Sequence, residues 1–122
     1  MKIEVSNGEI VDKLTILELK RQNAQTQEQE RHIAEELEYL QPIVDGMDIP
    51  VDIINQLREV NKKLWEVEDM LRGYEKKGVL DRQFITFARA VYQTNHARFR
   101  LKSTVNELTN SLFVEEKIHP EI

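Results

Sequence analysis

The residues of this sequence that are best suited to chemistry are basic, and they lie close together near the carboxyl end. Residues 82–106 contain five arginine or lysine residues and no aspartate or glutamate. Within this range, Asn95, Arg98 and Lys102 follow one another at intervals of three and four residues, which places them on one face of a helix. An amide, a guanidinium and an ammonium group on one face could bind a phosphate or a carboxylate.

Two interpretations of this basic face are open. In one, Arg98 and Lys102 pair with carboxylates of the same chain, as charged groups must when they are buried. In the other, they converge with Asn95 on an anionic ligand. Internal pairing is the favoured interpretation, because residues 1–41 hold nine acidic side chains against five basic ones. The carboxylates considered as partners are those of Glu28, Glu30, Glu59 and Glu66.

Further polar residues join this face if the preceding helical segment packs against it. That segment carries a minor stripe with Asn61, Trp65 and Glu68. An antiparallel hairpin would carry Asn61 toward Asn95, while Trp65 would be either a packing residue with a bonded N–H or the wall of a pocket. The candidate ligand-binding residues are therefore Lys13, Asn61, Trp65, Glu68, Arg89, Tyr92, Asn95, Arg98 and Lys102.

Most other kinds of site lack the residues that they need. The chain has no cysteine, which excludes disulfides, thiolate metal sites and a thiol nucleophile. Its histidines, His32, His96 and His119, do not have the spacing of metal ligands. It also contains no HExxH, GxSxG, GxGxxG or Walker motif. The sequence predicts no metal, no cofactor and no catalytic residue, and it leaves open whether the protein is an enzyme.

Three long stretches of chain must position these residues. The glycines and prolines that separate the stretches lie at residues 42–50 and at Gly78. This pattern predicts an all-α fold with three long helices in an antiparallel coiled-coil-like bundle. The helices are expected at about residues 7–41, 51–77 and 81–112, within one domain that covers residues 1–122.

Local signals refine the first two helices. A short extended segment, residues 1–6, leads into the first helix, where Ser6 and Glu9 have the spacing of a capping box. The polar stretch Gln22–Arg31 is the place where this helix would break. In the second helix, apolar residues repeat at alternating intervals of four and three, as coiled-coil packing requires. They are Ile53, Leu57, Val60, Leu64, Val67, Leu71 and Tyr74.

The first helix is apolar on two sides, which suggests a partner. Ile10, Leu14 and Leu17 share one side, whereas Ile16 and Leu19 project from the other. A helix that is apolar nearly all round is covered on more than one face. A three-helix monomer would leave one of these faces uncovered, so a homodimer is favoured over cover by the terminal segments of the chain.

The overall charge and hydropathy narrow the range of partners. The chain has 17 basic and 22 acidic residues and a net charge of −5. An acidic protein is not expected to bind nucleic acid, because the phosphate backbone favours positively charged surfaces. No apolar run approaches the ~18 residues of a membrane span, and the first residues lack the apolar core of a signal peptide. We therefore expect a cytoplasmic protein that binds neither nucleic acid nor membranes.

Four segments resemble, in order, the motifs of a functionally uncharacterised family of small helical bacterial proteins. They are the opening Ser6–Lys20, the middle segment Asn61–Asp69, the segment Phe84–Asn95 and the ending Val114–Lys117. The resemblance brings no known activity, so it implies no catalytic residue. It does imply a shared polar network inside the bundle. The polar residues at the motif positions are Asp12, Lys13, Glu18, Asn61, Glu68, Tyr92, Thr94, Asn95 and Arg98.

Two functions are compatible with these features. The first is a non-catalytic helical interaction or scaffold protein that self-associates, which the heptad repeat and the two-sided first helix support. The alternative is a small helical enzyme or binding protein with a site for an anionic small molecule, a phosphate or a carboxylate, on the third helix. What faces Arg98 and Lys102 in the folded chain discriminates between them.

Overall fold

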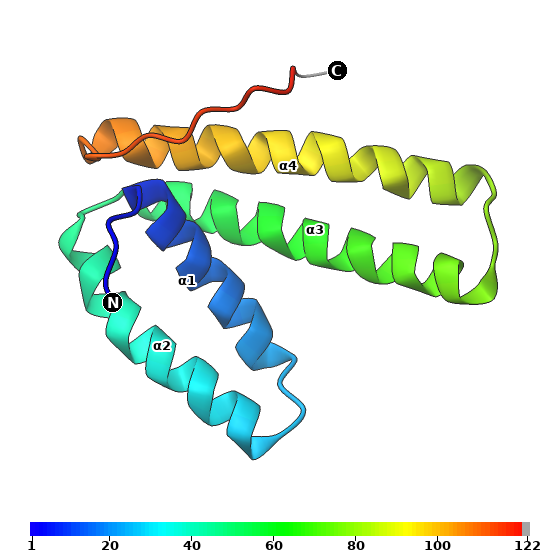
Figure 1. Ribbon diagram of the computed structural model, residues 1–122, viewed down its shortest axis with the longest axis horizontal. Coiled ribbons are helices and arrows are strands. Elements are labelled where there is room, and N and C mark those ends of the chain that lie inside the picture. Colours follow the sequence, from blue (N-terminus) through cyan, green and yellow to red (C-terminus); the bar gives the residue numbers. More distant parts are fainter. Residues whose placement is uncertain (121–122) are drawn as a thin grey trace.

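The computed structural model describes residues 1–120 and contains four helices in two antiparallel hairpins (Figure 1). No β-strand occurs in these residues. The helices are α1 (Asn7–Gln22), α2 (Gln27–Gly46), α3 (Val51–Lys77) and α4 (Arg82–Leu108). No helix in the described part of the chain has the length and apolar character needed to cross a lipid bilayer.

The prediction of three helices is wrong, because the expected first helix is two helices joined by a turn. Asn23 ends α1, and its backbone N–H bonds to the carbonyl groups of Lys20 and Arg21. Thr26 begins α2 by accepting a hydrogen bond from the backbone N–H of Gln29 at 3.0 Å. The side chain of Gln29 accepts a bond from the backbone of Gln25 at 2.9 Å. These two hydrogen bonds fix the start of α2 and therefore the position of the break inside the polar stretch.

The boundaries of two other helices also differ from expectation. α2 continues through Pro42 to Gly46, although proline removes a helix hydrogen bond. The added turn buries Val44 in the core, which compensates for that loss. α4 ends at Leu108 rather than near residue 112, because Asn110 takes a positive φ and the N–H of Ser111 bonds back to a carbonyl group in the last turn.

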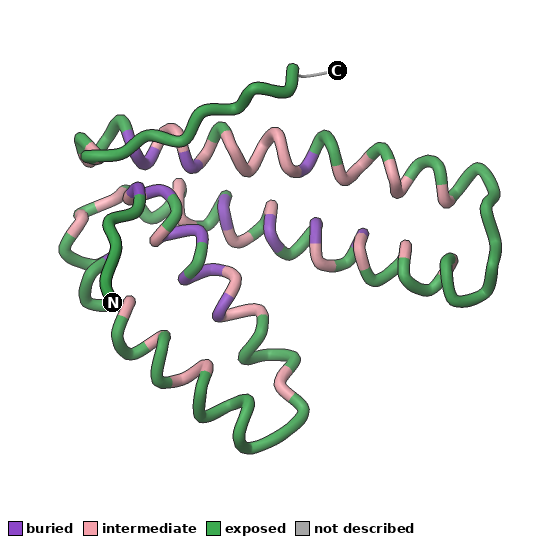
Figure 2. The backbone as a smooth tube through the Cα atoms, in the orientation of Figure 1, coloured by how far each residue is buried: buried purple, intermediate pink, exposed green. Residues whose placement is uncertain are grey.

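The hydrophobic core lies where the four helices meet. Its fully buried members come from every helix: Val11 and Leu14 from α1, Val44 from α2, Leu57 from α3 and Val105 from α4. Figure 2 shows the buried residues concentrated on α1 and on the parts of α3 and α4 beside it. α1 packs against each of the other three helices.

The additional helix, α2, covers a part of α1 that a three-helix bundle would leave uncovered. α1 is covered by α3 and α4 on one side and by α2 on another, and Leu37 and Leu40 of α2 pack against the core. α1 therefore has helices of its own chain on more than one side, and Ile16 and Leu19 are half-buried. Its two-sided apolar character does not require a second subunit.

The α3–α4 hairpin is longer than the α1–α2 hairpin and projects beyond it (Figure 1). No residue of α3 after Val67 is buried, and none of α4 before Thr94. We call the projecting part, residues 68–77 and 82–93, the distal hairpin. It contains the last two members of the predicted heptad repeat, Leu71 and Tyr74, both only half-buried.

After α4 the chain turns back and runs along that helix (Figure 1). We call this segment, residues 109–120, the C-terminal strap. The ammonium group of Lys117 lies 5.6 Å from the centre of the Phe99 ring of α4, within the range of a cation–π interaction. The strap leaves its own apolar side chains exposed, including Leu112, Phe113 and Ile118.

Candidate functional site

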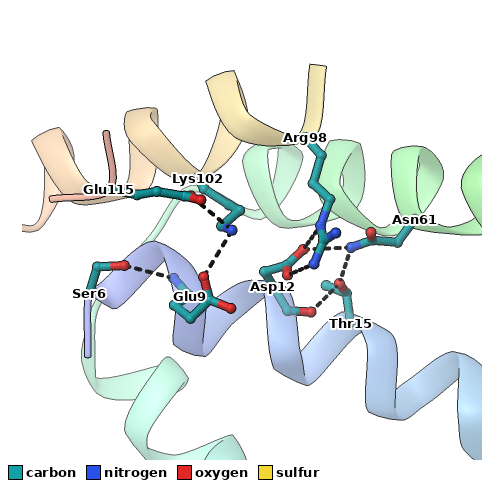
Figure 3. Close-up of polar contacts among 8 residues, drawn as sticks. All are labelled: Ser6, Glu9, Asp12, Thr15, Asn61, Arg98, Lys102 and Glu115. Carbon is teal, nitrogen blue, oxygen red and sulfur yellow. Dashed lines mark hydrogen bonds and ion pairs between the residues drawn. The ribbon is translucent and has the colours of Figure 1, made fainter. Parts of the chain in front are cut away.

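A buried aspartate on α1 forms the centre of the polar network of the molecule (Figure 3). Asp12 is 1% exposed and points toward α4. The Nε of Arg98 donates to Asp12 Oδ1 at 2.8 Å, and the Nη2 of Arg98 donates to Oδ2. The planar guanidinium thus engages both carboxylate oxygens, the geometry that arginine supplies and lysine does not.

α3 joins the same centre through an amide. The Nδ2 of Asn61 donates to Asp12 Oδ1 at 2.9 Å and to Thr15 Oγ1 at 2.8 Å. The Thr15 hydroxyl donates in turn to the backbone carbonyl of Asp12 at 2.8 Å. These hydrogen bonds connect α1, α3 and α4, and each carboxylate oxygen of Asp12 accepts at least one of them.

A second centre lies at Lys102, one turn further along α4. The Lys102 ammonium lies 2.9 Å from a carboxylate oxygen of Glu9 on α1 and 2.9 Å from one of Glu115 on the C-terminal strap. The lysine side chain is only 8% exposed, whereas both glutamates are partly open to solvent. Lys102 is thus the point at which α1, α4 and the strap meet (Figure 3).

Both cations are held in their charged forms. The hydrogen bonds to Asp12 raise the pKa of Arg98 above its ordinary value; burial opposes the rise, and the charges of Asp12, Glu9 and Glu115 add to it. Burial lowers the pKa of Lys102, but the bonds to Glu9 and Glu115 outweigh this effect, so the pKa is raised above the ordinary lysine value. Neither group can therefore act as a proton acceptor at neutral pH.

The first turn of α1 is closed by residues from the end of α4. The backbone N–H of Asn7 donates to Ser111 Oγ at 3.0 Å, and that of Gly8 donates to Asn106 Oδ1 at 2.7 Å. Ser6 accepts from the N–H of Glu9 at 3.3 Å, as the capping-box spacing predicts. The donors that would make this helix end an anion site are therefore used within the chain.

The remaining predicted site residues are dispersed. Lys13 faces α2, where it lies 3.4 Å from Glu36. Glu68 pairs loosely with Arg72 at 3.9 Å, Arg89 is exposed, and Trp65 is half-buried on α3. Tyr92 and Asn95 line a hollow of about 310 Å³ between α4 and the C-terminal strap.

Of the nine predicted residues, Asn61, Arg98 and Lys102 thus belong to the network. Sequence reasoning missed several partners of these residues. The carboxylates that pair with Arg98 and Lys102 belong to Asp12, Glu9 and Glu115, and none of these was among the expected partners. The motif positions carried the missing signal for Asp12, which stood there beside Asn61 and Arg98. No sequence pattern pointed to Thr15, because its role depends on which side of α1 faces α3.

The network has the composition of a structural device. Arg98 and Lys102 each face carboxylates of the same chain, and their pairs with Asp12 and Glu9 connect α4 to α1. A third ion pair connects α3 to α1: Nε and Nη2 of Arg58 donate to the Glu18 carboxylate at 3.0 and 3.3 Å. Buried polar groups of this kind fix the register of packed helices at some cost in stability. Among residues 1–120, no three histidine, aspartate or glutamate side chains are grouped so as to hold a metal ion.

The fold and the polar network define an all-α, four-helix protein whose first helix is held against α4 by ion pairs. The chain belongs to a family of unknown function, DUF6165, which it matches over residues 1–120. The resemblance of its four sequence motifs to an uncharacterised family is thereby confirmed. Searches of curated proteins and of solved structures find no match.

Proposed function

We propose that the protein is a non-catalytic interaction protein that self-associates through the distal hairpin. One observation carries this proposal. The face of α4 that packs on α1 continues beyond the end of α1, and there it is apolar and only half-buried.

Helix geometry establishes that the two halves of this face are continuous. At about 100° per residue, Phe84, Ala88 and Val91 lie on the same line of α4 as Arg98 and Lys102. The second half of the line binds carboxylates of α1 and the strap. The first half has no helix over it (Figure 1).

We define the distal face as Leu71, Tyr74, Phe84, Ala88 and Val91, with Ile85 and Tyr92 at its edge. Ile85 and Tyr92 are 50% and 70% exposed. Tyr74 packs against Phe84 with ring centres 6.3 Å apart, so the aromatic side chains are already ordered. An ordered apolar patch is typical of a protein interaction site.

The alternative function, a site for an anionic small molecule on α4, has less support. Arg98 and Lys102 would have to bind the ligand, yet their donors are engaged by Asp12, Glu9 and Glu115. A ligand would have to displace a buried, bidentate ion pair, which is costly. We propose no catalytic residue for the same reason.

We also propose a cytoplasmic location, in keeping with the acidic and cysteine-free composition. Fractionation of cells that produce the protein is the test.

Light scattering coupled to size exclusion tests the self-association. The wild type is expected to be a dimer that dissociates on dilution from submillimolar to low micromolar concentration. Ala88→Glu places a charge in the distal face while keeping a strong helix former, so it is expected to give a monomer. Thr86→Glu adds the same charge to an exposed position of α4 outside the face, so it should leave the dimer intact.

The controls make the result decisive. Circular dichroism must show unchanged helix content for Ala88→Glu, which is expected because Ala88 contacts no part of the four-helix core. A wild type that is monomeric at every concentration would contradict the proposal. So would equal behaviour of the two glutamate variants.

A further inference from the structure

We infer that the hollow between α4 and the C-terminal strap binds a small molecule that carries a carboxylate or a phosphate group on a flat ring. The hollow has a volume of about 310 Å³. This size lies at the lower end of the range for ligand pockets, roughly 300–1,000 Å³. It therefore fits a small molecule and is too small for a peptide or a helix. The inference goes beyond the proposed self-association and does not depend on it.

Two segments form the walls of the hollow. One wall is α4 and the other is the strap, which runs along that helix (Figure 1). The lining residues include Tyr92, Asn95 and His96 from α4 and Lys117, His119 and Pro120 from the strap. Tyrosine, histidine and proline side chains are ring-shaped, so a flat ring in the ligand would have ring surfaces to pack against.

Contacts within the chain hold the strap against α4, so the hollow is formed before a ligand arrives. The Glu115 carboxylate of the strap lies 2.9 Å from the Lys102 ammonium of α4. The Lys117 ammonium lies 5.6 Å from the centre of the Phe99 ring, and the His96 ring lies 6.3 Å from the same ring. Phe99 thus connects the two walls. Walls that are already in place reduce the entropy that binding costs.

The charges around the hollow favour an anion. Lys117 supplies an ammonium group, and the histidines supply imidazoles, which can carry a proton. None of the described residues that line the hollow is acidic, and residues 82–106 contain no aspartate or glutamate. The strap has two glutamates within residues 109–120: Glu115 is paired with Lys102, and Glu116 does not line the hollow. A negatively charged group would therefore meet attraction without a nearby repelling carboxylate.

Asn95 provides a polar group that the fold does not use. The amides of Asn61 and Asn106 bond within the chain, whereas the half-buried Asn95 side chain makes no hydrogen bond to any of residues 1–120. An amide N–H can donate to a carboxylate or phosphate oxygen, and such a bond is stronger than one between neutral groups. An anion bound here leaves the ion pairs of Arg98 and Lys102 closed, unlike a ligand bound by those two residues.

Solution NMR with three ring-bearing probes tests the inference. The probes are benzoate, phenyl phosphate and benzamide, which is a neutral molecule of the same shape as benzoate. Each is titrated in a buffer without phosphate or carboxylate. At millimolar concentrations, at least one of the two anions is expected to shift the amide signals of residues 92–96 and 117–119 until they saturate. Benzamide should bind several-fold more weakly than benzoate, and comparison of the two anions identifies the preferred charged group.

Two variants and a matched control identify the residues that bind. Lys117→Gln removes the ammonium group, whereas Asn95→Asp keeps the size of the side chain and the contacts of the strap but sets a negative charge against the ligand. Each should weaken binding of the preferred anion about tenfold or more, the effect of losing one charge-assisted contact. Lys63→Gln alters an exposed lysine of α3 that does not line the hollow, and it should bind as the wild type does.

Three results would refute the inference. They are the absence of saturable shifts with both anions, binding of benzamide as tight as that of benzoate, and wild-type affinity in both Lys117→Gln and Asn95→Asp. Signals from the rest of the chain show in the same spectra whether each variant keeps its fold. A monomeric wild type would refute the proposed self-association and leave this binding site unaffected.

Discussion

At the scale of single residues, charged side chains occupy interior positions where proteins usually have aliphatic side chains. Asp12 is fully buried among Arg98, Asn61 and Thr15, and a buried carboxylate is tolerated only because it has these donors. The sequence led to the expectation that Arg98 and Lys102 pair within the chain, but it named other carboxylates. Helical periodicity indicates which residues share a face, and it does not indicate which distant helix that face meets.

Removing Arg98 should therefore be costly. Arg98→Ala leaves the Asp12 carboxylate buried without its cation, and breaking such a pair from one side costs about 3–5 kcal/mol of unfolding free energy. Urea denaturation measures this. Arg89→Ala, an exposed arginine on the same helix, should cost less than about 0.5 kcal/mol.

A double variant separates the pair from the packing around it. Adding Asp12→Ala to Arg98→Ala removes the orphaned charge, so the double variant should be less destabilised than the sum of the two single variants. Additive losses would show that the ion pair is not the source of the effect.

Lys102 predicts a dependence of stability on alkaline pH. Because the pKa of Lys102 in the folded protein is raised above the ordinary lysine value, the charged lysine stabilises the fold at pH values below that ordinary value, and this contribution is lost as the pH rises through the folded-state pKa. Lys102→Met should therefore destabilise the protein at neutral pH, and its difference from the wild type should shrink in the alkaline range where lysine loses its proton.

Denaturation at a series of pH values gives this difference directly. The matched control is Lys62→Met, which removes an exposed lysine from α3 and should change the unfolding free energy little. A difference for Lys102→Met that stays constant through the alkaline range would contradict the role assigned to its charge.

At the scale of elements, the strongest local sequence signals identified the helices, whereas the signal for the turn between α1 and α2 was weak. The heptad repeat of residues 53–74 lies within α3, and Asp81 caps α4 through the N–H of Phe84 at 3.1 Å. The polar stretch Gln22–Arg31 marked where the first helix would break, but one helix was still expected there, because residues 23–26 contain neither glycine nor proline. The threonine–glutamine spacing of Thr26 and Gln29 was the available signal, and it is weak because many polar stretches contain it.

The glycines give a prediction about helix packing. Gly8 lies where α1 approaches α4 most closely: a Cβ there would come within 3.0 Å of Asn106 Oδ1 and would press on the carbonyl group of Lys102. Gly8→Ala should thus destabilise the protein by about 1–3 kcal/mol through overpacking. Gly73→Ala meets nothing within 4 Å in the middle of the distal hairpin, and it should stabilise by about 0.5–1 kcal/mol.

These two variants make the same chemical change with opposite expected signs. Thermal or urea denaturation of both, at one protein concentration, provides the comparison. A stabilising Gly8→Ala would mean that α1 and α4 do not approach as closely as the structure has them.

At the scale of the whole molecule, the two ends of the α3–α4 hairpin have different surroundings. One end belongs to a four-helix unit with buried residues from every helix, and the other is a two-helix hairpin without a buried residue. Composition and periodicity predicted an all-α protein, but not this division. It depends on the break between α1 and α2, which makes the helices of the first hairpin 16 and 20 residues long, against 27 residues for each helix of the second.

The bonds between the beginning of α1 and the end of α4 have a consequence for biosynthesis. Asn7 and Ser111 are 104 residues apart, Gly8 and Asn106 are 98 apart, and Asp12 and Arg98 are 86 apart. A ribosome adds about 5–20 residues per second, so α1 waits several seconds or longer before its partners on α4 emerge. Through this interval Val11 and Leu14 lack part of their cover, so α1 exposes apolar side chains until α4 has been synthesised.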